Sequence, residues 1–377
     1  MVPLPALFPP ADGGHHTWPA PNYVDPETRG WGAPAGIIFM CVVTSCVVVA
    51  RLWARFGIKR TAGWDDWLII ASMPGLLGLT ISTVLALRVY GFQLHIWDQT
   101  PRTHITVRQI TMAMEVIYIG TTTLTKLSIL MFYRRITSSV LSRPLLICIW
   151  ASIVFVALYG PATILALIFT CDPVEAYWYR FTTSWLRTHE YKCVDEVIYL
   201  VAVISISTAQ DFLACMLPMF VVYKLRLPLR QKIGLACVFL LGLAVCATGA
   251  LRIHYAHRLL YYTRLNPSPT YDITWEALGS WVATAVETNV SIICASAPAL
   301  NAYFKGWFGL TGYQERSFGW YGKTARTWSG PCEGSDKTLA DGEKVEMPCR
   351  SYGSASVSGC SEMLQRNDSI VPILKAR

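Results

Sequence analysis

The stretch that decides the fold is residues 145–170, LLICIWASIVFVALYGPATILALIFT, which contains no charged side chain. A transmembrane helix needs about 20 mainly apolar residues to cross the hydrocarbon core of a bilayer. The run is continuous, whereas the strands of membrane barrels alternate apolar and polar residues. Because lipid offers the backbone no hydrogen-bond partner, a run of this kind predicts a membrane-spanning helix.

Other apolar stretches of similar length lie on both sides of this one. We expect membrane spans near residues 34–52, 66–87, 110–133, 145–170, 198–223, 233–253 and 280–303. The composition agrees, since 53% of the 377 residues are hydrophobic and 15% are charged, against about 25% charged in a soluble domain. The sequence therefore predicts an all-α membrane protein, a seven-transmembrane helix bundle that occupies residues 34–304.

Lysine and arginine set the expected orientation of this bundle. They gather in three short segments on one side, 51–60, 134–143 and 224–232, whereas the loops on the other side are longer and carry fewer of them. The positive-inside rule then places the amino terminus outside, with residues 1–33 as an extracytoplasmic segment, and the carboxyl terminus in the cytosol. Residues 305–377 are rich in Gly, Ser, Lys and Glu, so we expect a disordered cytosolic tail.

The net charge of +8 does not indicate nucleic acid as a partner, because the basic residues lie largely in these loops and in the tail. The partner that the sequence predicts is the lipid bilayer. The chain has no phosphate-binding loop, and the last span has no lysine that could form a Schiff base with retinal. We therefore expect no cofactor, no retinal and no metal ion.

Charged side chains inside the predicted spans are the strongest functional signal. They are Glu115, Lys126, Asp211 and Glu287. An ionisable group at membrane depth is costly, so it faces the protein interior or a wet cavity and finds a partner there. Glu115 and Lys126 are eleven residues apart, which at roughly 100° per residue puts them on nearly the same helix face, with Thr122 between them.

Two further polar stripes lie in the fifth and seventh spans. Asp211 lies in the first of them, at nearly the depth of Lys126, and we expect these two side chains to form an ion pair within the bundle. Glu287, in the other stripe, lies at about the depth of Glu115. If these two carboxylates are close together, one of them is protonated at neutral pH; if they are apart, each needs its own donor.

Three interpretations of these residues remain open: a purely structural polar core, a cavity for a ligand or an ion, and a catalytic site. The candidates for the polar core or ligand cavity are Glu115, Thr122, Lys126, Asp211, Glu287 and Asn289. Inward polar stripes often hold membrane helices together, which supports the structural interpretation. No catalytic residue is assigned, and the protein is more readily interpreted as a non-enzyme.

Two loop features carry separate predictions. Cys171 and Cys193 flank a stretch between the fourth and fifth spans on the predicted outer side, where the medium is oxidising, so we expect a disulfide bond between them. Asp65 and Asp66 stand at the start of the second span, where acidic residues cap a helix and complement its positive end.

The chain resembles the fungal rhodopsin-domain integral membrane proteins, including the type encoded in satratoxin-biosynthesis clusters, over roughly residues 34–304. The motifs that carry the resemblance are Asp65-Asp66-Trp67; Gly91 to His95 with Ile96-Trp97-Asp98; Lys126-Leu127-Ser128-Ile129-Leu130 with Tyr133-Arg134-Arg135; Cys171-Asp172-Pro173 with Trp178 and Cys193; Asp211 with Pro218; and Glu287-Thr288-Asn289 with Pro298. Gln93 stands where that family usually has a second turn glycine. The resemblance implies seven helices, an outer-loop disulfide and a fungal origin, without implying retinal binding.

The function that this resemblance implies is a non-enzymatic accessory protein of fungal secondary-metabolite, or mycotoxin, biosynthesis. We expect it to sense or handle a small apolar metabolite in the plasma membrane or an endomembrane of a fungal cell. One alternative is a receptor like the G-protein-coupled receptors, with a cytosolic signalling partner at the basic inner loops near Arg226 to Lys232. Others are a small-molecule transporter and a membrane-embedded cyclase with Asp211 or Glu287 as general acid.

Overall fold

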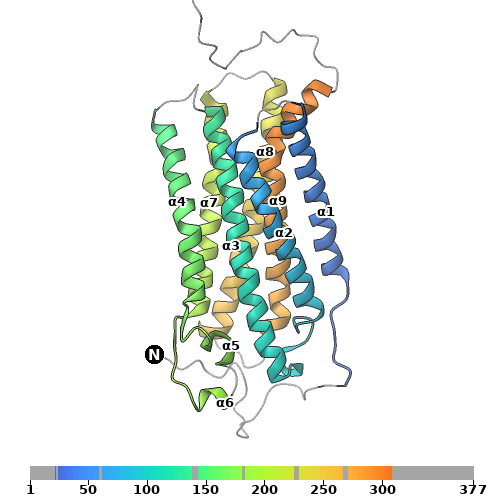
Figure 1. The fold of residues 1–377 in the computed structure, drawn as a ribbon, viewed down its shortest axis with the longest axis vertical. Coiled ribbons are helices and arrows are strands. Elements are labelled where there is room, and N and C mark those ends of the chain that lie inside the picture. Colours follow the sequence, from blue (N-terminus) through green and yellow to red (C-terminus); the bar gives the residue numbers. More distant parts are fainter. Residues whose placement is uncertain are drawn as a thin grey trace, which may run out of the picture. The chain divides into compact units, whose positions relative to one another are not determined.

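Seven long helices form the membrane domain (Figure 1). The computed structural model describes residues 22, 24–58, 62–137, 143–180, 183–224, 229–265 and 271–307. The long helices are α1 (Gly32–Leu52), α2 (Trp64–Arg88), α3 (Pro101–Thr137), α4 (Arg143–Ile168), α7 (Glu196–Lys224), α8 (Leu229–Leu260) and α9 (Ile273–Trp307). Short π-helical turns extend two of them, η1 (Trp53–Ile58) after α1 and η3 (Tyr261–Leu265) after α8. Each long helix is apolar and long enough to cross a bilayer, which confirms the predicted seven-helix bundle.

Several helices run past the ends of the predicted spans. Helix α3 begins at Pro101 and α9 at Ile273, whereas the apolar windows begin at 110 and 280. A hydropathy window detects only the part of a helix that suits hydrocarbon, while the helix itself continues through the interfacial layer. This extension matters for the site, because it places polar side chains such as Arg108 on a helix at the edge of the membrane domain.

Helices α3 and α9 form the centre of the bundle. Helix α3 packs against α2, α4, α7 and α9, and α9 also packs against α1 and α8. About half of the most apolar window of each is buried, 50% in α3 and 56% in α9, against 22–28% in the other five spans. The polar residues of α3 and α9 therefore face other helices, whereas the outer helices present their apolar residues outward.

Close packing of α3 depends on two glycines of its neighbours. A methyl group added at Gly75 of α2 would lie 2.1 Å from Oγ1 of Thr121, and one added at Gly160 of α4 would lie 2.4 Å from Oγ1 of Thr123. Both separations are far shorter than van der Waals contact. Small residues at helix interfaces let membrane helices approach closely, which is the main source of their packing energy.

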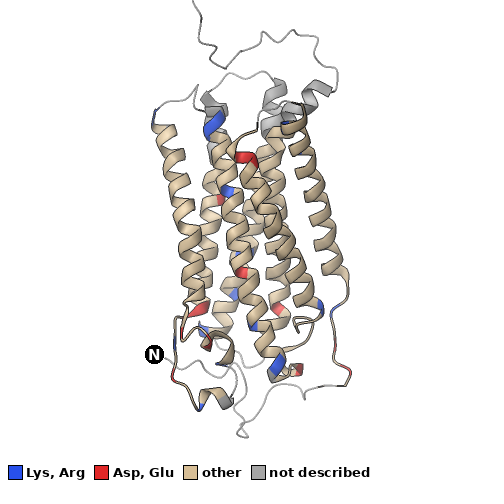
Figure 2. Ribbon diagram, in the orientation of Figure 1, with Lys and Arg blue, Asp and Glu red and all other residues tan. Residues whose placement is uncertain are grey.

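The outward faces of α1, α4 and α8 suit lipid tails. They expose large apolar side chains, among them Phe39, Val49, Leu158 and Leu240, each more than half exposed. Figure 2 shows that charged residues are few along the middle of the bundle and gather nearer its ends. The chain is thus a multi-pass membrane protein in a lipid bilayer.

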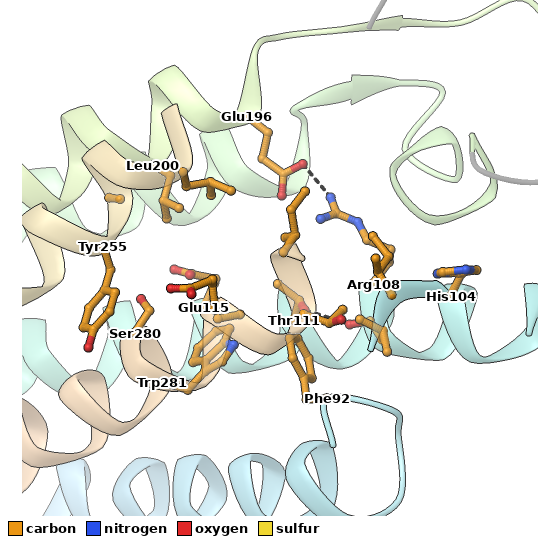
Figure 3. A pocket seen from close by; sticks show the side chains of 18 of the residues that line it. Phe92, His104, Arg108, Thr111, Glu115, Glu196, Leu200, Tyr255, Ser280 and Trp281 are labelled. Atoms are coloured by element: carbon orange, nitrogen blue, oxygen red, sulfur yellow. Dashed lines mark hydrogen bonds and ion pairs between the residues drawn. The ribbon is translucent and has the colours of Figure 1, made fainter. Parts of the chain in front are cut away.

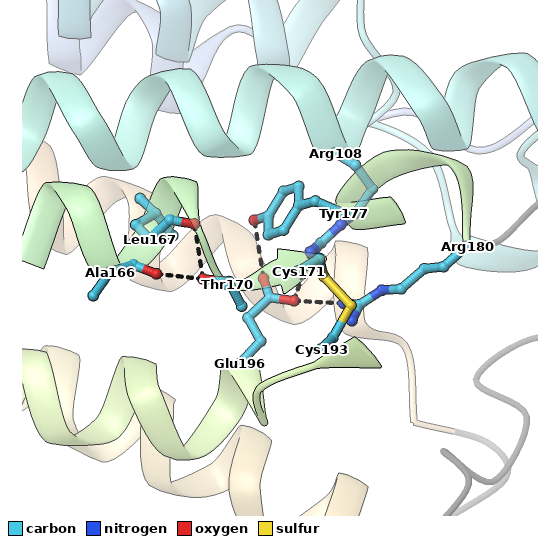
Figure 4. The surroundings of a disulfide bond; sticks show 9 residues. All are labelled: Arg108, Ala166, Leu167, Thr170, Cys171, Tyr177, Arg180, Cys193 and Glu196. Atoms are coloured by element: carbon cyan, nitrogen blue, oxygen red, sulfur yellow. Dashed lines mark hydrogen bonds and ion pairs between the residues drawn. A yellow bond between two sulfur atoms is a disulfide. The ribbon is translucent and has the colours of Figure 1, made fainter. Parts of the chain in front are cut away.

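A small clasp closes one end of the bundle, between α4 and α7. Strand β1 (Cys171–Asp172) pairs antiparallel with β2 (Lys192–Cys193), and the short helices α5 (Ala176–Tyr179) and α6 (Thr183–Leu186) lie between them. A disulfide bond joins Cys171 to Cys193, as predicted from the sequence (Figure 4). We call this end of the bundle the disulfide end. The expected extracytoplasmic segment and cytosolic tail lie largely outside the described residues, which leave out 1–21 and 308–377.

Candidate functional site

A cavity of about 190 Å³ lies between α3, α7, α8 and α9 near the disulfide end (Figure 3). Along α3 it extends from His104 to Glu115, which is roughly 16 Å at 1.5 Å per residue. Most of its wall is apolar and aromatic, and includes Phe92, Leu200 and Trp281. Ligand sites in proteins are typically concave and mostly apolar, with a few polar groups that fix orientation. We call this space the main cavity.

The polar wall nearest the disulfide is a tight ionic cluster around Glu196, the first residue of α7 (Figure 4). Its Oε2 accepts hydrogen bonds from Nη2 of Arg108, at 2.5 Å, and Nη2 of Arg180, at 2.7 Å. Its Oε1 accepts a third from the hydroxyl of Tyr177, at 3.0 Å. Burial raises the pKa of Tyr177 well above the usual range, despite the nearby Arg108, so the phenol stays a neutral donor. Through Glu196, these hydrogen bonds connect Tyr177 and Arg180 of the clasp to Arg108 of α3.

Glu115 lies at the inner part of the main cavity, near Ser280 and Trp281 (Figure 3). Of the six candidates from the sequence, it alone lines this cavity. Its carboxylate forms no hydrogen bond or ion pair at contact distance with any residue that the structure describes. Arg252 acts on it electrostatically, without contact.

Glu287 has two buried partners, neither of which the sequence predicted. Its Oε2 lies 3.2 Å from Nη1 of Arg252, and its Oε1 accepts a 2.7 Å hydrogen bond from the hydroxyl of Tyr118. The guanidinium of Arg252 also contacts that hydroxyl and lies over the Tyr118 ring. Glu287 and Arg252 are each 2% exposed. Glu287 therefore has its own donors and does not share a proton with Glu115 through direct contact.

Arg252 was not predicted to be a buried partner of Glu287, because it stands at the end of the expected span 233–253. Helix α8 continues to Leu260, and the membrane-crossing segment continues through η3 to Leu265. Arg252 therefore lies well inside the bundle. The signal that could have revealed it is the continued helical spacing of apolar and aromatic residues after Arg252, at Tyr255, Ala256 and Leu259.

The predicted ion pair between Lys126 and Asp211 is present. Nζ of Lys126 lies 3.1 Å from Oδ1 of Asp211 and donates to both the backbone oxygen and the hydroxyl of Ser207, each at 2.8 Å. Thr122, one turn away, donates to the backbone oxygen of Tyr118 in its own helix. Thr122, Lys126 and Asp211 line a cavity of only about 30 Å³. This space suits water-sized occupants and not a metabolite.

Asn289 joins two helices. Its Oδ1 accepts a 2.7 Å hydrogen bond from Thr44 of α1, and its Nδ2 donates to the backbone oxygen of Ala285. It does not line the main cavity. Asp211 and Glu287, the acids of the cyclase alternative, do not line it either, and both are paired with cations.

A third ionic cluster lies toward the opposite end of the bundle. Arg51 is completely buried and donates to Asp65 at 2.9 Å and to Asp66 at 3.0 Å, and its Nη1 donates to the backbone oxygen of Ala295 at 2.5 Å. The sequence assigned Arg51 to a basic loop, which was wrong. The capping prediction is confirmed for Asp66, whose Oδ2 accepts from the backbone N–H of Gly63, but its ion pair with Arg51 was missed.

Metal ligation finds no support in the described part of the chain, where no three His, Cys, Asp or Glu side chains gather closely enough to hold an ion. The arrangement can bind and orient a small molecule in the main cavity. It also holds α1, α2, α3, α7, α8 and α9 together through buried charge pairs. These are the properties of a seven-helix, multi-pass membrane protein with a ligand-sized space at its disulfide end.

The chain belongs to the fungal rhodopsin domain family, whose family model matches residues 50–306. This confirms the resemblance seen in the sequence motifs. Two of those motifs meet in space, since the hydroxyl of Ser128 donates to the backbone oxygen of Asp65 at 2.7 Å. The family relationship and the seven helices together define the chain as a seven-helix membrane protein of this family.

Three named relatives from other fungi are similar to this chain. The chain is 27% identical over 274 residues to receptor GIN3 of Arthrobotrys oligospora, covering 69% of this chain and 59% of that protein. It is 26% identical over 197 residues to a SAT4 family membrane protein of Emericella nidulans, covering 52% and 46%. It is 25% identical over 282 residues to the polyenoic acids biosynthesis gene cluster protein Ba17b of Metarhizium anisopliae, covering 72% of each. The chain thus spans about half to three fifths of the length of the first two.

Proposed function

We propose that this chain is a non-enzymatic accessory protein of fungal secondary-metabolite biosynthesis, which senses or handles a small, largely apolar molecule in the main cavity. The observation that carries the proposal is the cavity itself, about 190 Å³ with a mainly apolar wall and few polar groups. The name of Ba17b as a biosynthesis gene cluster protein supports the metabolic assignment. The proposal includes no retinal, because the sequence offers no lysine within the membrane-crossing part of α9.

Filling the main cavity tests this function. Ser280 lines the cavity beside Glu115, and Ser280→Trp is expected to occupy much of the space and exclude a ligand (Figure 3). In a strain that lacks the gene, wild-type protein restores the metabolite profile, whereas Ser280→Trp is expected to leave the profile of the deletion strain. Untargeted mass spectrometry of culture extracts measures both.

The matched control is Leu158→Trp, which adds the same ring on the outward face of α4, where Leu158 is 68% exposed. This variant is expected to restore the wild-type profile. Equal protein levels in membrane fractions establish that each variant accumulates. A Ser280→Trp strain with a wild-type profile at normal protein level would refute a role for the cavity.

We also propose that the disulfide end faces away from the cytosol, in the plasma membrane or an endomembrane. In Cys171→Ser the loss of the bond frees Cys193, and a membrane-impermeant maleimide is expected to label it in sealed microsomes only after detergent. The tail cysteines Cys332, Cys349 and Cys360 are expected to react without detergent. Mass spectrometry of the labelled peptides reports each site. Labelling of both regions in intact vesicles would place both on one side and contradict an odd number of spans.

A signalling receptor is the second candidate function. The observation in its favour is that buried charges extend from the main cavity into the bundle, through Glu115, Arg252 and Glu287. One relative is named a receptor. The partner would be a cytosolic protein at the basic segment from Arg226 to Lys232, whose side chains lie outside the described residues. Ligand-dependent capture of such a partner separates a receptor from an accessory protein.

A further inference from the structure

The carboxylates that line the main cavity differ in their partners. Glu196 is bound by Arg108, Arg180 and Tyr177. Glu276 lies 3.5 Å from Arg258 at the partly exposed rim. Glu115 is the lining carboxylate that no described residue contacts through a hydrogen bond or an ion pair. Its position deeper along α3 leaves its oxygens available to an occupant of the cavity (Figure 3).

The charges in the middle of the bundle do not balance. Three carboxylates lie there, on Glu115, Asp211 and Glu287, against two cations, on Lys126 and Arg252. Lys126 is bound to Asp211, and Arg252 to Glu287. The surplus negative charge therefore belongs to Glu115. A carboxylate at membrane depth with no contacting donor is costly, so Glu115 either takes up a proton or binds a cation.

The surroundings of Glu115 favour a cation. The aromatic side chains Tyr199, Tyr255 and Trp281 line the same cavity. Aromatic faces attract ammonium groups, and the attraction grows when water is excluded. Arg108, the arginine that lines the cavity, lies 2.5 Å from Glu196, so this cation already has a carboxylate partner, whereas Glu115 has no contacting donor among the described residues.

We propose that the main cavity takes a small amphiphilic amine, whose protonated amino group binds the Glu115 carboxylate while its apolar body fills the aromatic wall. This inference rests on the proposed function and names the chemical class of the ligand. It assigns the neutral part of the molecule to the wall near Phe92 and Trp281. The bond to Glu115 would balance the charges of the inner group formed by Glu115, Lys126, Asp211, Arg252 and Glu287.

The test compares two probes with the same body, 2-(1-naphthyl)ethylamine and 1-naphthaleneethanol. Equilibrium dialysis uses the full chain in phosphatidylcholine nanodiscs at pH 7, with empty nanodiscs subtracted. The amine is expected to bind roughly tenfold to a hundredfold more tightly than the alcohol, the range for a hydrogen bond to a charged group. In Glu115→Gln this preference is expected to disappear, while the alcohol binds as before.

Two controls keep the result specific. Glu276→Gln removes a rim carboxylate that already has Arg258 as a partner, and it is expected to keep the preference for the amine. The N-acetylated amine has the same body without the charge, so on wild-type protein it is expected to bind like the alcohol, even if Glu115→Gln fails to fold.

The outcomes separate the two proposals. Equal binding of amine and alcohol to wild-type protein would overturn the amine ligand and leave the cavity proposal intact. A preference for the amine that survives in folded Glu115→Gln would also overturn it. Binding of both probes that Ser280→Trp leaves unchanged would place them outside the cavity and count against both proposals.

Discussion

Replacing Arg51 with methionine is expected to prevent most of the protein from reaching a stable fold. The Arg51 side chain is completely buried and binds two carboxylates, on Asp65 and Asp66, and the backbone oxygen of Ala295. Removing one partner of a buried ion pair costs about 3–5 kcal/mol. Whole domains are stable by about 5–15 kcal/mol, so the loss consumes a large part of the total. Size-exclusion chromatography and melting in one detergent measure the effect.

A matched control and a rescue define this prediction. Arg143, at the exposed start of α4, is the control, and Arg143→Met is expected to behave like the wild-type protein. Adding Asp65→Asn and Asp66→Asn to Arg51→Met removes the stranded charges and is expected to recover part of the stability. If Arg51→Met melts as the Arg143 control does, the cluster does not stabilise the bundle. Arg51→Lys is expected to be intermediate, because an ammonium cannot reproduce the planar fork of a guanidinium.

Arg252→Met is expected to have the second large effect. It leaves Glu287 without its cation in a fully buried site and also removes a positive charge that acts electrostatically on Glu115. The expected cost is again about 3–5 kcal/mol, read as a lower melting temperature of the purified protein. In the double variant Arg252→Met with Glu287→Gln, more than half of this loss is expected to return, because no unpaired charge remains beside Tyr118.

The control for this pair is Arg258, which lies further along α8. Arg258 contacts Glu276 at 3.5 Å, but both side chains are more than a third exposed. Arg258→Met is therefore expected to cost less than about 1 kcal/mol, as surface ion pairs do. A double variant no more stable than Arg252→Met alone would show that Arg252 stabilises the fold through packing and not through its charge.

The sequence was sufficient for the features that follow from a single span or loop, or from the depth of a residue within its span. The seven spans follow from apolar runs, because a helix that crosses the hydrocarbon core needs about 20 mainly apolar residues in succession. The pair between Lys126 and Asp211 was predictable because both residues lie deep inside such runs and at nearly the same depth. The disulfide between Cys171 and Cys193 followed from two cysteines in one predicted outer loop.

The candidate site was only partly predictable for the same reason. A window of hydropathy treats charged residues near the end of an apolar run as its boundary, so the sequence placed Arg51 in a basic segment and did not single out Arg252. The structure buries both, since the helices continue past the apolar windows and the neighbouring helices supply the carboxylates. Which carboxylate pairs with a given arginine depends on which helix faces meet. The residues that determine this packing lie far apart in the chain.

The sequence by itself determined the class of this protein: seven apolar helices, a disulfide in one loop and a small set of charges that must face inward. The tertiary structure alone decided that Arg51 pairs with Asp65 and Asp66, that Arg252 pairs with Glu287, and where a ligand-sized space remains. The reason is that crossing a membrane is a property of each helix separately. A cavity and an unpaired carboxylate exist only after α3, α7, α8 and α9 have packed together and left Glu115 without a partner among the described residues.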